Sequence, residues 1–195
     1  MGAPVRHLRI IHMIPFKPIE GRLVRLRQIT AADEKDMFEW ASDPEVSRHL
    51  PWNAHESIKE TRAYIRECID AYVNGEWIPL AIEDIDTGRV EGNIALYSVK
   101  PRHGIAEIAF VLSPKLWGGG HLMEAASLLI GWAFRELEIN RIQAVASVDN
   151  VHSFSALERM GMKYEGILRQ YMSINGRFCD VKIYAILKSE WPERN

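Results

Sequence analysis

Apolar and polar residues follow two different periodicities along the first part of the chain. Residues 21–29 (GRLVRLRQI) alternate leucines with arginines loosely at period two, which predicts a strand. Thr30 and the acidic stretch after it predict an N-cap and a helix. That helix should stop near residues 43–44, because the residue before a proline is disfavoured in the helical region. A second helix with an apolar face is predicted over about residues 56–73.

The middle of the chain changes to strand-like runs. Three such runs, at 77–83, 90–99 and 105–112, are separated by turn signals and predict an antiparallel meander. A glycine run follows, and after it apolar residues recur at helical spacing. This spacing predicts a helix that packs its stripe on the sheet. The stripe consists of Leu122, Ala126, Leu129, Ala133 and Leu137.

The last third of the chain returns to alternating patterns. Residues 141–148 alternate small or apolar residues on one face and predict a strand. Asn150 is suited to cap a short helix that ends near Gly161, a residue that tolerates the left-handed conformation. Two final strands, at about 163–173 and 178–188, flank Asn175-Gly176, which is a strong hairpin signal.

Composition excludes several classes of protein. The formal net charge is −2 and the pI is about 6.4, so the excess of Lys and Arg needed for sequence-independent nucleic-acid binding is absent. No apolar run reaches the roughly 18 to 20 residues of a membrane span. Cys68 and Cys179 fall in different predicted elements, and no paired Cys/His set indicates a metal. We therefore expect a cytoplasmic protein with free thiols, no metal, and neither nucleic acid nor membrane as a partner.

The first residues lack the pattern of the rest. Charged residues, histidines and a proline interrupt the apolar residues before position 16, so this segment is neither a signal-peptide core nor an anchor. The strand-like pattern begins only after Met13. We expect residues 1–15 to be an extension outside the fold, with residues 1–12 as a leader, and residues 16–195 to form a single domain.

Three local motifs occur in order along the chain. They are residues 114–125 (PKLWGGGHLMEA), residues 150–153 (NVHS) with 159–162 (RMGM), and residues 165–169 (EGILR) with 176–180 (GRFCD). With the order of predicted elements, they resemble the GNAT acetyltransferases, and in particular the RimJ/RimL-type branch, whose named members acetylate N-terminal amines of ribosomal proteins. The resemblance covers about residues 16 to 190. It implies an α+β GNAT fold: a mixed, mostly antiparallel sheet of about seven strands, splayed at its centre, with helices on both faces.

The resemblance implies that the glycine loop binds the pyrophosphate of acetyl-coenzyme A. A glycine-rich turn entering a helix offers clustered backbone N–H groups and the positive end of the helix dipole, and glycine lets the backbone approach closely. The Walker pattern is excluded because His121-Leu122 follows the last glycine, and the third glycine of the dinucleotide fingerprint is replaced by Met123. The residues expected at the cofactor are Val111, Leu112, Lys115, Trp117, Gly118, Gly119, Gly120, His121, Leu122, Asn150, Ser153 and Arg159.

Ordinary structural roles stay open for some of these residues. Lys115 and Arg159 could be solvated surface side chains. Asn150 could serve only as an N-cap, a role that is compatible with the contact to the pantetheine arm that the resemblance implies. The hydroxyl of Ser153 could satisfy a backbone group in the first helical turn.

Ser153 and Glu107 are the candidate catalytic residues. The resemblance implies that Ser153 faces the thioester sulfur. Glu107 lies in an apolar strand, where a charge is costly unless it is hydrogen-bonded or used, so it is either a general base or a structural glutamate. Two positions depart from the family pattern: Leu157 stands where many GNAT enzymes carry a tyrosine acid, and Met172 stands where ribosomal-branch relatives can carry a carboxylate.

Trp40, His49, Trp52 and Arg169 are the candidate substrate-binding residues. The resemblance makes the connection between the first two helices a wall of the acceptor cleft, although packing on the sheet is the alternative for the tryptophans. His49 and His55 are weaker candidates for the base. The acceptor could be a protein N-terminal amine or a small amine such as an antibiotic or polyamine. A rival function is a catalytically silent acyl-coenzyme A sensor, which the missing tyrosine and carboxylate favour. A homodimer is also left open.

Overall fold

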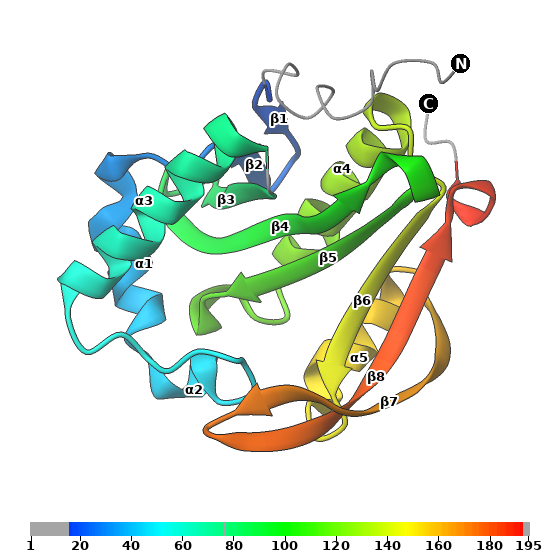
Figure 1. Cartoon of the computed structure of the whole chain (residues 1–195). Coiled ribbons are helices and arrows are strands. Elements are labelled where there is room, and N and C mark those ends of the chain that lie inside the picture. The colour runs from blue at the N-terminus through cyan, green and yellow to red at the C-terminus, as the bar shows by residue number, and fades with distance from the viewer. Residues whose placement is uncertain (1–15, 76, 193–195) are drawn as a thin grey trace, which may run out of the picture.

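The computed structural model describes residues 16–75 and 77–192. Its helices are α1 (Glu34–Ala41), α2 (Pro44–Ser47), α3 (Ile58–Asn74), α4 (His121–Glu136) and α5 (Val151–Arg159). Its strands are β1 (Ile19–Glu20), β2 (Val24–Arg27), β3 (Ile78–Asp84), β4 (Val90–Lys100), β5 (Ile105–Leu112), β6 (Arg141–Ser147), β7 (Lys163–Ile174) and β8 (Arg177–Leu187). Over these described residues they form one mixed sheet in the order β1-β2-β3-β4-β5-β6-β8-β7 (Figure 1).

The sheet corrects the predicted count of seven strands, because eight strands are present in the described part of the chain. Strand β1 has two residues and pairs antiparallel with β2. Two residues are too few to show the alternation of apolar and polar positions that predicts a strand. Helix α2 was also not predicted. It begins at Pro44, and the side chain of Asp43 accepts a hydrogen bond from the N–H of Glu45. The predicted extension, residues 1–15, lies outside the described residues.

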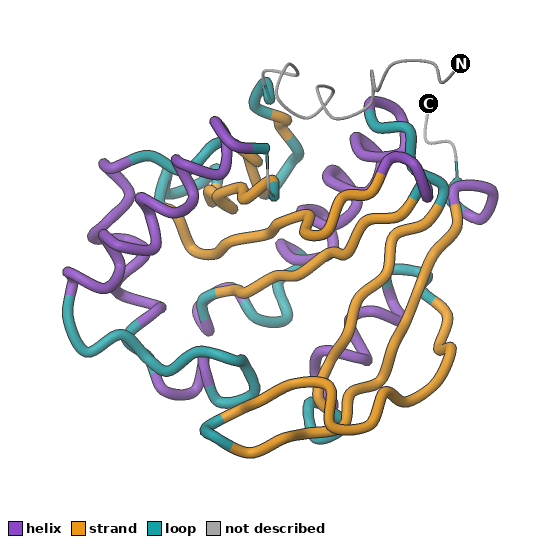
Figure 2. The backbone as a smooth tube through the Cα atoms, viewed as in Figure 1, coloured by secondary structure: helices purple, strands orange, loops and turns teal. Residues whose placement is uncertain are grey.

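Two hydrophobic cores lie on opposite faces of the sheet. Helices α4 and α5 pack on one face, where Leu129 and Leu157 are almost fully buried against β-strand residues such as Ile94. Helices α1 and α3 pack on the other face, where Met37 and Cys68 are buried. Figure 2 shows the strands as a layer between these helices. Each fully buried leucine contributes about 1.5–3 kcal/mol relative to an exposed one, so the predicted stripe of α4 is a major source of stability. None of the described helices is long and apolar enough to span a membrane.

The centre of the sheet forks between β5 and β6. These strands pair in parallel over three positions only, from Ile105 with Arg141 to Glu107 with Gln143. Beyond that point β5 stays paired with β4 as far as Leu112, whereas β6 stays paired with β8. The two halves of the sheet diverge visibly in Figure 1. The predicted splay is therefore present, and among the described residues the edge of β5 that faces β6 has no strand partner from residue 108 onward.

Glu124 fixes the start of α4 to the first strands. Its carboxylate accepts hydrogen bonds from the backbone N–H groups of Arg22, Leu23 and Val24, at 2.9, 2.6 and 2.9 Å. A Cβ on Gly21 would lie 2.6 Å from Glu124 Cδ, so glycine is needed for this close approach. The contact holds the first turn of α4, and the glycine loop before it, against the sheet.

Candidate active site

A cavity of about 520 Å³ opens where β5 and β6 separate. Its walls come from β4, β5, β6 and β7, from α1, α3 and α5, and from the segment between α1 and α3. Seven of the predicted site residues line it: Trp40, His49, Trp52, Glu107, Val111, Asn150 and Ser153. The glycine loop, Arg159 and Arg169 do not line it. Arg159 is exposed at the end of α5, and Arg169 is exposed on β7.

Glu107 lies at the fork itself. It is the last residue of β5 that pairs with β6, and its Oε2 accepts a hydrogen bond from Gln143 Nε2 at 3.4 Å. The side chain is half-buried, and its register partner on β4 is Tyr97. The bond from Gln143 is its one hydrogen bond within the described residues. The carboxylate therefore keeps an oxygen available to accept a proton inside the cavity.

Asn150 and Ser153, at the start of α5, also line the cavity. The Oδ1 atom of Asn150 accepts a hydrogen bond from the N–H of Ser153 at 3.1 Å, which confirms the predicted N-cap. The hydroxyl of Ser153 makes no hydrogen bond within the described residues and lines the cavity. Leu157 is 1 % exposed and lines the same cavity, so a buried apolar side chain occupies this position.

The glycine loop lies between a 3₁₀ turn, Pro114–Leu116, and α4. Gly118 and Gly120 have φ angles of +77° and +86°, a region that favours glycine. A Cβ on Gly118 would meet nothing within 4 Å, so this side of the loop is open. The indole Nε1 of Trp117 donates to the carbonyl of Leu112 at 2.9 Å and joins the loop to the end of β5. Because the first N–H groups of a helix have no intrahelical acceptor, α4 begins with free donors beside this open turn.

Two other predicted cofactor residues lie beside carboxylates. Lys115 Nζ forms a salt bridge with Glu39 of α1 and lies 3.7 Å from Glu91 Oε1. The hydrogen bond to Glu39 raises the pKa of Lys115. His121 Nε2 lies 3.6 Å from Asp84 Oδ1, and its buried Nδ1 atom has no hydrogen-bond partner in the part of the chain that the structure describes. These contacts fasten the loop to α1 and β3, and Leu122 packs against the main core.

Helix α1 and the segment between α1 and α3 supply the aromatic wall. Trp40 of α1 is 4 % exposed and its Nε1 donates to the carbonyl of Val90 at 3.1 Å, so this tryptophan packs on the sheet as well as lining the cavity. The ring of Trp52 is half-buried with its centroid 5.5 Å from that of His55. Nδ1 of His55 is 2.8 Å from Thr61 Oγ1. Desolvation lowers the pKa of His55, although attraction to Glu60 opposes the shift.

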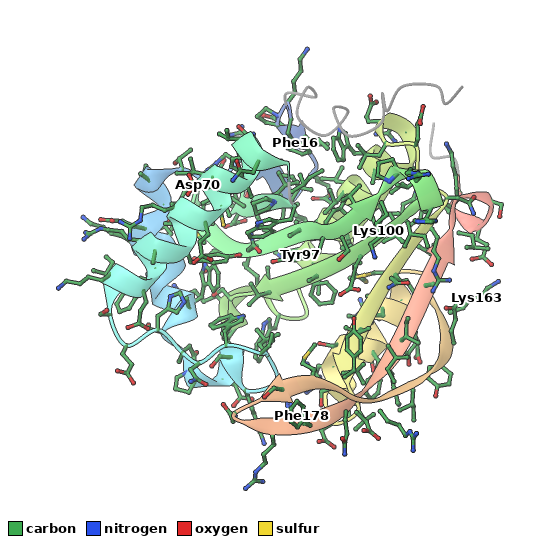
Figure 3. All side chains as sticks on the ribbon, viewed as in Figure 1. Phe16, Asp70, Tyr97, Lys100, Lys163 and Phe178 are labelled. Atoms are coloured by element: carbon green, nitrogen blue, oxygen red, sulfur yellow. The ribbon has the colours of Figure 1, made fainter. Side chains whose placement is uncertain are left out.

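Several cavity residues were not predicted from the sequence. The hydroxyl of Tyr64 donates to Asn93 Oδ1 at 3.2 Å, and Tyr97 stacks on Trp77 with ring centroids 4.7 Å apart. Figure 3 labels Tyr97 on β4, between α1 and α3 on one side and β6 and β8 on the other. Asn93 and Tyr97 share one face of β4, so period-two spacing could have pointed to them. Gln143 carries no such local signal, because only the register of β5 and β6 places it beside Glu107.

The family description "Acetyltransferase (GNAT) domain" matches residues 23–163. The uncharacterized N-acetyltransferase YoaA of Bacillus subtilis is 34% identical over 173 residues, which cover 89% of this chain and 98% of that protein. The chain therefore belongs to the GNAT acetyltransferase family. This membership confirms the predicted family and fold.

One more relative and one solved structure are also similar to this chain. YdaF of Bacillus subtilis, provisionally named a ribosomal N-acetyltransferase, is 36% identical over 104 residues, or 53% of this chain and 57% of that protein. This likeness supports the predicted branch. A GCN5-related N-acetyltransferase from Brucella melitensis has a solved structure that superposes with a TM-score of 0.82 and 28% identity, covering 90% of this chain and 80% of that one.

Proposed function

We propose that this acetyltransferase moves an acetyl group from acetyl-coenzyme A to a primary amine. One observation carries the proposal: Glu107, with a free carboxylate oxygen, and Ser153, with a free hydroxyl, line the same cavity at the fork of the sheet. A proton acceptor for the amine and a hydrogen-bond donor for the departing thiolate both assist amine attack on a thioester. Family membership supplies the reaction class.

The residues present fit the cofactor. The open turn at Gly118 and the free N–H groups at the start of α4 would hold the pyrophosphate, and Asn150 with the unpaired edge of β5 at Val111 and Leu112 would hold the arm that enters the fork. When bound, acetyl-coenzyme A supplies a thioester carbonyl as the electrophile. The carboxylate of Glu124 lies near this turn, but it accepts hydrogen bonds from three backbone N–H groups. These bonds reduce its repulsion of the pyrophosphate.

Each side chain of the fork has a defined task in this proposal. Glu107 accepts the proton that the amine must lose, directly or through water, and Gln143 holds the carboxylate in place. Backbone N–H groups on the free edge of β5 polarise the carbonyl. The Ser153 hydroxyl donates a hydrogen bond to the departing sulfur. Because a thiol with a pKa of about 8.5 is already a good leaving group, this assistance is modest and the missing tyrosine is tolerable.

A catalytically silent sensor that binds acyl-coenzyme A is the rival function. It is favoured by Leu157 and Met172, which replace two groups used by relatives. The two functions separate in one pair of assays, calorimetry with coenzyme A and thiol release from acetyl-coenzyme A in the presence of a broad panel of amines and peptides. Reproducible turnover excludes the sensor. Tight binding without turnover on any acceptor contradicts the proposed enzyme.

A further inference from the structure

Several polar groups that line the cavity on the side of α1, α3 and β4 already have hydrogen-bond partners. Asn93 accepts from Tyr64 through Oδ1 and donates through Nδ2 to the carbonyl of Leu80, at 3.2 and 3.1 Å. The Nδ1 atom of His55 is engaged with Thr61, and Trp40 Nε1 with a backbone carbonyl. A substrate group that displaced one of these partners would leave a buried polar atom unsatisfied, which is costly in a partly desolvated site.

Few charged side chains line the cavity. Within the described part of the chain, Glu107 is the one carboxylate that lines it, and no lysine or arginine does. A substrate with a second ammonium group would bury a cation without a partner, and a substrate with a carboxylate would bury an anion without one. The remaining surface is mostly aromatic and aliphatic, with rings from Trp52, Tyr64 and Tyr97.

We infer, building on the proposed amine acetylation, that the acceptor is a small monoamine with an apolar body, an aromatic one above all. Its single amino group would face Glu107 at the fork, and its body would lie against the rings of the α1–α3 segment and β4. Polyamines and aminoglycosides carry several cations. Free amino acids add a carboxylate, and peptides add backbone amides, so the cavity disfavours all of these.

Matched acceptors test the inference with the full chain and acetyl-coenzyme A. Hexylamine is compared with hexamethylenediamine, which adds only a second amine, and phenethylamine is compared with phenylalanine, which adds only a carboxylate. A peptide amide beginning with phenylalanine represents protein N-termini. Each kcat/KM is measured by release of the coenzyme A thiol. We expect each monoamine to exceed its charged counterpart, and the peptide, by at least about tenfold, since unpaired polar groups are strongly rejected by such sites.

The outcomes separate this inference from the function on which it rests. Higher kcat/KM for the diamine, phenylalanine or the peptide than for the monoamines would overturn the inference and leave amine acetylation standing. No thiol release with any acceptor would contradict both. Faster release with phenethylamine than with hexylamine would support an aromatic body, and the reverse order would contradict that part.

Met172 provides a gain-of-function test. It is half-buried on β7 and lines the cavity, so Met172→Glu adds a second carboxylate, whereas Met172→Gln adds the same shape without charge. We expect Met172→Glu to raise the ratio of kcat/KM for the diamine over hexylamine by about tenfold or more relative to Met172→Gln. Equal ratios in the two variants would show that the charge of the cavity does not select the acceptor.

Discussion

Glu107 and Gln143 form the last pair of residues that β5 and β6 share, and their side chains are joined by a hydrogen bond with Nε2 and Oε2 3.4 Å apart. The sheet opens immediately after this pair. The fork therefore places one carboxylate in the wall of the cavity, which residues of α5 also line. The proposed mechanism gives Glu107 the proton-accepting role on this basis.

Replacing Glu107 by glutamine should remove the base but keep the shape. We expect kcat/KM to fall by about 10² to 10⁴ near neutral pH, because general-base assistance has this magnitude. The defect should shrink as pH rises, since more of the acceptor amine is then neutral without help. The pH–rate profile of thiol release is the measurement. A Glu107→Gln profile identical to that of the wild type would eliminate the assignment.

Ser153→Ala should lower turnover while leaving coenzyme A affinity nearly unchanged, because the hydroxyl acts mainly as charge develops on sulfur. The decrease should be near 10², the low end for acid assistance. The N-cap survives, since Asn150 accepts from the backbone N–H of residue 153. A variant that loses affinity and keeps its turnover would make Ser153 a binding contact only.

The charge sensitivity of the glycine loop can be tested at Gly118. Asn and Asp tolerate the left-handed region better than other residues with a side chain, and a Cβ has open space there. Gly118→Asp and Gly118→Asn therefore differ chiefly in charge. We expect the aspartate variant to bind coenzyme A at least about tenfold more weakly than the asparagine variant, or about 1.4 kcal/mol, by calorimetry. Added salt should narrow the difference. Equal affinities would place the pyrophosphate elsewhere.

Local signals predicted most of the fold. The stripe of α4 is set by its own spacing, and the Asn175-Gly176 hairpin by a pair of residues that adopt positive φ, at +49° and +74°. The Asn150 cap needed only the neighbouring residues of α5. Each of these features is determined by residues that lie close to one another in the sequence, so a single sequence is enough to predict it.

The parts that sequence reasoning missed depend on distant segments. Lys115 is bound to Glu39 and His121 lies beside Asp84, across separations in sequence that no motif encodes. Gln143 reaches Glu107 only through the register of β5 and β6, two strands that are separated in sequence by helix α4. Arg169, predicted at the substrate, is exposed on β7 and away from the cavity lining, and its contact with an acceptor stays a prediction.

Glu124 gives a prediction about stability and pH. Burial alone would raise the pKa of its carboxyl, but the hydrogen bonds from the N–H groups of Arg22, Leu23 and Val24 hold it below the ordinary value of 4.5. The lowered pKa means that Glu124 stabilises the native state above about pH 4.5 and loses this effect as pH falls through the folded-state pKa. Glu124→Gln should cost about 1–2 kcal/mol at neutral pH.

Urea unfolding at several pH values provides the test of Glu124. The difference between wild type and Glu124→Gln should be full near pH 7 and should narrow below about pH 4.5. A difference that stays constant down to acid pH would show that the contribution does not depend on the charge of the carboxylate.

The central claim is that the fork between β5 and β6 receives the reactive end of the cofactor. A crystal structure with coenzyme A tests it most directly. The account predicts that the pyrophosphate lies against the backbone at Gly118–Gly120 and that the pantetheine arm runs between β5 and β6. The sulfur of coenzyme A should contact the hydroxyl of Ser153, inside the cavity that Glu107 also lines. Coenzyme A bound with its thiol outside the fork, or away from the glycine loop, would contradict the account.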